Sequence, residues 1–78
     1  MTTDATQIAA ALTTLKKAWK SVRRAEAKMA RANGWQERDK AVRAVERAEA
    51  RLRVAQTETV IRFGRDAMVR LNKIAGAC

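Results

Sequence analysis

The stretch Ala32-Asn33-Gly34-Trp35 determines the fold of this chain, because it interrupts what would otherwise be one long helix-forming sequence. Asparagine and glycine tolerate the left-handed backbone conformation that ends a helix, and they stand together only at Asn33-Gly34. The chain contains no proline, so no other residue forces the backbone to stop. The sequence therefore predicts an all-α fold in which two helices pair as an antiparallel hairpin.

Length and composition limit how this fold is stabilised. A chain of 78 residues is at most one small domain, 1–78, with a thin core. It has one cysteine, Cys78, and no histidine, so neither a disulfide within the chain nor a zinc site is expected. Small folds without such links usually depend on oligomerisation. We therefore expect at least a homodimer, or folding completed on a partner.

The first predicted helix, about 4–32, has a heptad-like apolar seam. Asp4 or a threonine before it is expected to cap the start of the helix. Glu26 interrupts the seam. Either it lies at the open edge of the hairpin while Ala25 takes the buried place, or it is a buried charge that selects register by pairing with an arginine. We favour the open edge. The large seam residues are spaced four, three, four and three apart: Ile8, Leu12, Leu15, Trp19 and Val22.

The second predicted helix runs from about 35 to 74, after a turn at 33–34, and Gly64 is its one internal breaker. Its seam consists of small residues, which let two helix backbones approach closely. Ion pairs of the exposed-helix kind are expected where opposite charges stand four apart: Asp39 with Arg43, Glu49 with Arg53, and Glu58 with Arg62. The seam residues are Ala41, Val45, Ala48, Leu52 and Ala55.

The last turns of the second helix extend beyond the first helix and carry a broad apolar face. Such a face should be buried against another chain or folded back onto its own. We favour a continuous helix that dimerises as a helical bundle over a short third helix that turns back at Gly64. The residues predicted to form this dimerisation or partner-binding surface are Ile61, Phe63, Met68, Leu71 and Ile74.

Trp35 is a further candidate for partner binding, because it directly follows the turn. One interpretation is that it closes the hairpin end by packing on Met29 or Val42. The other is that it anchors an interface, as exposed tryptophans often do. We favour the packing role.

Basic residues form a stripe on the first helix, opposite its apolar seam. The formal net charge is +9, from 17 basic and 8 acidic residues, which attracts acidic protein surfaces, nucleic acid and anionic lipid alike. The stripe is either a solubilising outer face or a surface for electrostatic steering or phosphate contact. Its members are Lys17, Lys20, Arg24, Lys28 and Arg31.

Several function classes are disfavoured. Without histidine, and with one cysteine at position 78, we expect no catalytic residues, no metal ligands and no cofactor. No stretch approaches the roughly 20 apolar residues of a membrane span, and the N-terminus lacks the pattern of a signal peptide. We therefore expect a cytoplasmic protein that is not an enzyme and does not act at a membrane.

The chain has two predicted helices joined at Asn33-Gly34, and the second is longer and rich in arginine, alanine and glutamate. This format resembles the small helical-hairpin inhibitors that phages direct against host regulators. The resemblance is to the anti-quorum-sensing and pilus-assembly inhibitor type. It implies a dimer that sequesters a host protein such as a transcriptional activator or a motor ATPase. We favour an inhibitory protein-protein interaction module that contacts an acidic surface. The alternative is a small basic nucleic-acid-binding or regulatory protein.

Overall fold

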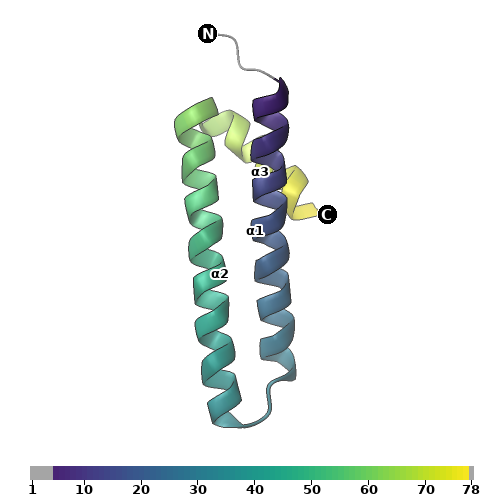
Figure 1. Cartoon of the computed structure of the whole chain (residues 1–78), viewed down its shortest axis with the longest axis vertical. Coiled ribbons are helices and arrows are strands. Elements are labelled where there is room, and N and C mark those ends of the chain that lie inside the picture. Colours follow the sequence, from purple (N-terminus) through teal and green to yellow (C-terminus); the bar gives the residue numbers. More distant parts are fainter. Residues whose placement is uncertain (1–4, 78) are drawn as a thin grey trace.

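The fold consists of three α-helices, which a computed structural model describes over residues 5–77 (Figure 1). The helices are α1 (Ala5–Arg31), α2 (Gly34–Phe63) and α3 (Arg65–Ala77). The all-α class predicted from the sequence is confirmed. Asp4, the predicted cap of the first helix, and Cys78 lie outside the described residues.

The helices α1 and α2 lie side by side and run in opposite directions along a rod of 53 × 20 × 17 Å (Figure 1). In the connection between them, Gly34 takes the left-handed conformation with φ +82°, whereas Asn33 is extended with φ −109°. The Asn33 amide donates a hydrogen bond of 3.0 Å to the carboxylate of Glu37. Glycine thus makes the turn, and an acid in the first turns of α2 holds it.

The core lies along the line where α1 meets α2 and contains the predicted small-residue seam. Of the predicted seam of α2, Ala41 is half-buried and the other four residues are buried. On α1, Leu15 is fully buried, whereas Ile8 near the start of the helix is 39% exposed. Large side chains of α1 therefore pack on small ones of α2. The buried core residues are Leu15, Val22, Ala25, Val45, Ala48, Leu52, Ala55, Leu71 and Ala75.

The prediction of one continuous helix from about 35 to 74 is wrong, because α2 ends at Phe63 and a separate helix begins at Arg65. Gly64 has φ +92° and ψ 166°, a conformation that is essentially restricted to glycine. Its amide still donates to the carbonyl of Val60 at 2.9 Å, and its own carbonyl accepts from the amide of Met68 at 3.1 Å. Gly64 therefore closes one helix and opens the next.

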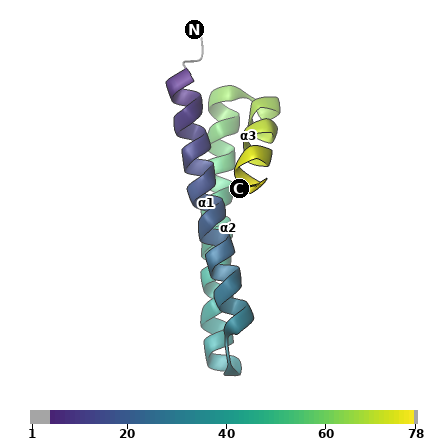
Figure 2. The same ribbon diagram turned by 90° about the vertical axis from the view of Figure 1, so that its right-hand side faces the viewer.

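After this break, α3 turns back and packs against both longer helices (Figure 2). The Asn72 side chain links the three helices, because its Oδ1 accepts 2.9 Å hydrogen bonds from Trp19 Nε1 of α1 and Gln56 Nε2 of α2. Near the end of α3, the ring of Trp19 covers Gly76, whose carbonyl accepts a hydrogen bond from the Arg23 guanidinium. The fold-back that the sequence left as an alternative is the observed arrangement.

Candidate binding surfaces

The predicted dimerisation surface is divided between the interior and the exterior of the chain. Leu71 belongs to the core, and Phe63 and Met68 are half-buried. Ile61 and Ile74 are 78% and 51% exposed. The cause is the bend at Gly64, which turns one side of α3 onto α1 and α2. The unpartnered overhang on which the predicted dimer depended is therefore not formed.

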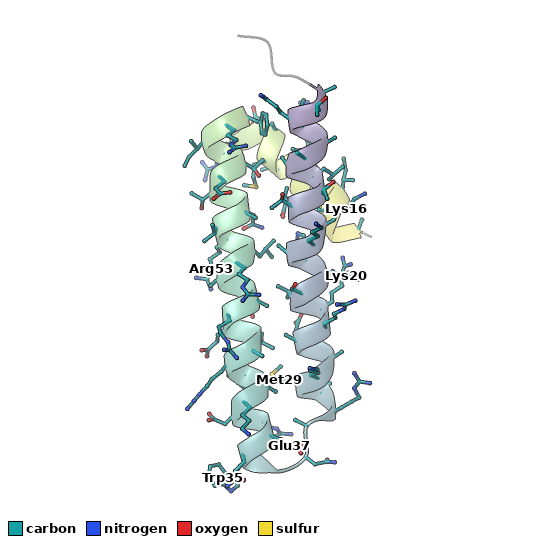
Figure 3. The ribbon with its side chains drawn as sticks, viewed as in Figure 1. Lys16, Lys20, Met29, Trp35, Glu37 and Arg53 are labelled. Atoms are coloured by element: carbon teal, nitrogen blue, oxygen red, sulfur yellow. The ribbon has the colours of Figure 1, made fainter. Side chains whose placement is uncertain are left out.

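Trp35 is the most exposed aromatic residue among residues 5–77, at 78% exposure, and it lies at the lower tip of the molecule (Figure 3). The favoured interpretation, that it closes the hairpin end against Met29 or Val42, is wrong. Met29 instead packs against the core, and Val42 is 37% exposed. The Trp35 side chain therefore lies largely in solvent.

Glu26 lies on the exposed surface, and Ala25 takes the buried place beside it, at 8% exposure. The favoured interpretation of the interrupted seam is thus confirmed. The carboxylate is not buried and therefore does not set the register of the helices.

The five residues of the basic stripe on α1 are all exposed. Figure 3 shows Lys20 on the side of α1 that points away from α2. Lys28 follows Trp19 by nine residues, which at about 100° per residue places the two on opposite sides of α1. Since Trp19 contacts α3, the stripe extends onto the face of the molecule that α3 leaves open.

A second row of basic residues lies on α2 and faces the same way. Arg47 precedes Gln56 by nine residues, and Lys40 precedes it by sixteen, so both stand nearly opposite the glutamine that binds Asn72. This row is not evident from the sequence, because acidic and basic residues alternate along α2. Of the stripe on α1, three residues stand most nearly opposite Trp19 and form the first row. We call this row and the row on α2 together the basic face. Its residues are Lys17, Arg24 and Lys28 of α1, and Lys40, Arg47 and Arg51 of α2.

The two rows meet at a shallow hollow near the turn. Lys28 and Arg31 line it from the last turn of α1, and Lys40 lines it from α2. The hollow is floored by small side chains, so the ammonium and guanidinium groups around it remain open to solvent. Glu37 is the one carboxylate at its rim, and it accepts the Asn33 amide hydrogen bond described above. The alanines of the floor are Ala32, Ala41 and Ala44.

Carboxylates border the basic face, but within residues 5–77 they form no direct ion pair with its cations. Of the three predicted ion pairs, one forms within 4 Å in this part of the chain, Asp39 with Arg43 at 3.2 Å, and the pairs Glu49 with Arg53 and Glu58 with Arg62 do not. Acidic residues do lie between the members of the two rows along the chain. At about 100° per residue, Glu49 projects from the other side of α2, but Glu46 lines a surface hollow with Lys40 and Arg47, and Glu58 lines one with Arg51. Glu37, Glu46 and Glu58 thus border the α2 row, but among the described residues none of them forms an ion pair within 4 Å with the six cations of the face.

The opposite end of the molecule has a small apolar hollow between the three helices, lined by Ile8, Phe63, Ala67, Arg70 and Leu71. Within residues 5–77, no three carboxylate or thiol side chains gather in a way that could hold a metal ion. No helix in this part of the chain is long and apolar enough to cross a membrane. The strongest candidate site is therefore the basic face.

Comparison with family models, with curated proteins and with solved structures gives no match for this chain.

Proposed function

We propose that this chain is a non-enzymatic nucleic-acid-binding protein that holds phosphate groups on the basic face. One observation carries the proposal: two rows of exposed cations, on two different helices, share the side of the molecule that α3 leaves open. Lysine and arginine that neutralise phosphates release the counterions condensed on nucleic acid, which is the main source of sequence-independent affinity. Such contacts fix a protein on the backbone without reading bases.

The position of α3 shifts the balance between the two functions considered from the sequence. A protein partner would need a broad apolar overhang, but α3 places Leu71 and Ala75 of that segment in the core. Phosphate groups would contact the stripe on α1, and the row on α2 adds cations from a second helix. Burial thus leaves less apolar surface for a protein partner, while the arrangement of charge favours phosphate binding.

Nucleic acid of mixed sequence is the first probe. We expect the logarithm of the affinity of the whole chain to fall linearly with the logarithm of the salt concentration. If about six phosphates are contacted, the affinity should fall about a thousandfold between about 50 and 200 mM salt. The double variant Lys28→Glu, Lys40→Glu should bind at least about tenfold more weakly than the wild type at 100 mM salt. Fluorescence anisotropy of a labelled probe measures both effects.

A matched variant separates a binding face from net charge alone. The double variant Arg38→Glu, Arg53→Glu makes the same change in charge at exposed residues on other sides of α2. It should keep most of the affinity. Equal losses in the two variants, or affinity that does not respond to salt, would contradict the proposal and leave the positive charge with a solubilising role.

A second candidate function is supported by Trp35. Large exposed apolar side chains of this kind often dominate the energy of protein interfaces, and Trp35 is 78% exposed at the tip. This candidate is the inhibitory interaction module that the resemblance to phage proteins implies, with a host regulator as its target. The basic face would then steer the chain toward an acidic surface.

The variant Trp35→Ala tests this second candidate. Because the side chain is largely in solvent, its removal should change the free energy of unfolding by no more than about 0.5 kcal/mol. Affinity capture from bacterial lysate treated with nuclease shows whether a stoichiometric protein is retained and whether Trp35→Ala releases it. Capture that is lost on nuclease digestion favours the nucleic-acid function instead.

A further inference from the structure

The two rows of the basic face repeat the same spacing. In α1, Lys17 is followed after seven residues by Arg24 and after four more by Lys28. In α2, the basic residues are again seven and then four apart: Lys40, Arg47 and Arg51. The helices α1 and α2 run in opposite directions (Figure 1). Equal spacing along antiparallel helices relates the two rows by an approximate twofold axis perpendicular to the face.

This symmetry identifies a class of ligand. The two phosphate strands of a nucleic-acid duplex are also antiparallel, and proteins with twofold symmetry commonly match that of the duplex. Packed helices lie about 8–10 Å apart at their axes, which is comparable with the roughly 6 Å and 12 Å widths of the grooves of B-form DNA. One row can therefore contact each strand across a groove.

Single-stranded nucleic acid fits this face less well. Proteins that hold single strands stack bases on exposed aromatic side chains. None of the aromatic residues within 5–77 belongs to the basic face. Trp19 donates its indole hydrogen bond to Asn72 under α3, Phe63 is half-buried, and Trp35 lies beyond the turn at the tip. The face offers cations without a stacking platform.

We propose that the basic face binds the phosphate backbone of a double-stranded nucleic acid, with the α1 row on one strand and the α2 row on the other. This inference depends on the proposed function, and it adds the strandedness of the ligand and the division of labour between the rows. Each row makes a similar contribution, because each presents three cations at the same spacing, Lys-Arg-Lys on α1 and Lys-Arg-Arg on α2. Contact is with phosphates, so the base sequence does not matter.

The inference is tested with three probes of equal length, a DNA duplex, an RNA duplex and a single DNA strand, each of mixed sequence. Binding should be at least about tenfold tighter to one or both duplexes than to the single strand at 100 mM salt. The slope of log affinity against log salt on the DNA duplex should be about −5, near the value for six phosphate contacts. The two duplex probes show whether B-form or A-form geometry is preferred.

The contribution of each row is measured with two variants, Lys17→Glu with Arg24→Glu in α1, and Arg47→Glu with Arg51→Glu in α2. Each pair should reduce the magnitude of the slope by about 1.8, which corresponds to two phosphate contacts. Circular dichroism verifies that both variants remain helical. The variant Arg38→Glu, Arg53→Glu is again the control of equal charge.

Two outcomes overturn the inference while leaving the proposed function intact: binding to the single strand as tight as to the duplexes, or a loss of slope confined to one row. Absence of salt-dependent binding to all three probes would instead contradict the proposed function itself.

Discussion

Replacing Gly64 with L-alanine is expected to lower the free energy of unfolding by about 1–3 kcal/mol, the usual range for a residue forced into a disfavoured backbone conformation. Gly64 has φ +92° and ψ 166°, and an added Cβ would meet no atom within 4 Å, so the penalty comes from the backbone alone. The variant avoids the penalty by continuing α2 as a straight helix, which detaches α3 and exposes Leu71. Urea denaturation followed by circular dichroism measures the loss.

Two controls separate backbone conformation from side-chain volume. D-alanine at position 64, introduced by chemical synthesis, adds the same methyl group but favours positive φ, so it should retain or raise the stability. The variant Gly76→Ala adds a methyl group inside α3, where the nearest atom of Trp19 would lie 3.4 Å away, and should be close to neutral or stabilising. A Gly64→Ala chain as stable as the wild type would show that the bend does not depend on glycine.

Replacing Asn72 with alanine is expected to lower the free energy of unfolding by about 1–3 kcal/mol. Asn72 Oδ1 accepts hydrogen bonds from both Trp19 Nε1 and Gln56 Nε2, so one substitution leaves two part-buried donors without their acceptor. Because these bonds join α3 to α1 and α2, the loss should appear first as release of α3. Hydrogen exchange of the α3 amides, compared with those of α2, measures this release.

The variant Asn72→Asp is the matched control, because a carboxylate keeps an acceptor oxygen where the amide had one. It should retain more of the stability than Asn72→Ala. Fluorescence reports on the site directly when Trp35 is replaced by phenylalanine, since Trp19 is then the one remaining tryptophan. Equal stability of Asn72→Ala and wild type would contradict the role of Asn72 as the link between the helices.

Much of the helical architecture followed from the sequence, because local signals determine it. Spacing and residue type predict the break at Asn33-Gly34, the small-residue seam of α2 and the exposed position of Glu26. The bend at Gly64 was not the favoured prediction, because apolar residues keep helical spacing on both sides of it. A single glycine is compatible with a helix interior. Only the fit of α3 onto Trp19 and Gln56 makes the bent form the better one.

The candidate site was predictable in part. The stripe on α1 was visible because no acid stands between Lys16 and Arg24. The row on α2 was hidden by the acids that alternate with it along the chain, and a helical projection of Arg47 and Glu49 would have separated the two signs. That both rows share a face depends on where α3 packs, which is a tertiary contact between residues far apart in the sequence. The exposure of Trp35 likewise depends on the geometry of the turn.

The most direct test of phosphate binding by the basic face is a map of the contact surface by nuclear magnetic resonance. Amide signals of the ¹⁵N-labelled chain are followed while a short DNA duplex of mixed sequence is added. We predict shifts concentrated in residues 17–28 of α1 and 40–51 of α2, with the amides of α3 little changed and the shifts reversed by salt. Shifts centred on α3 or on Trp35, or no shifts at a duplex concentration well above that of the protein, would contradict a phosphate-binding role for this face.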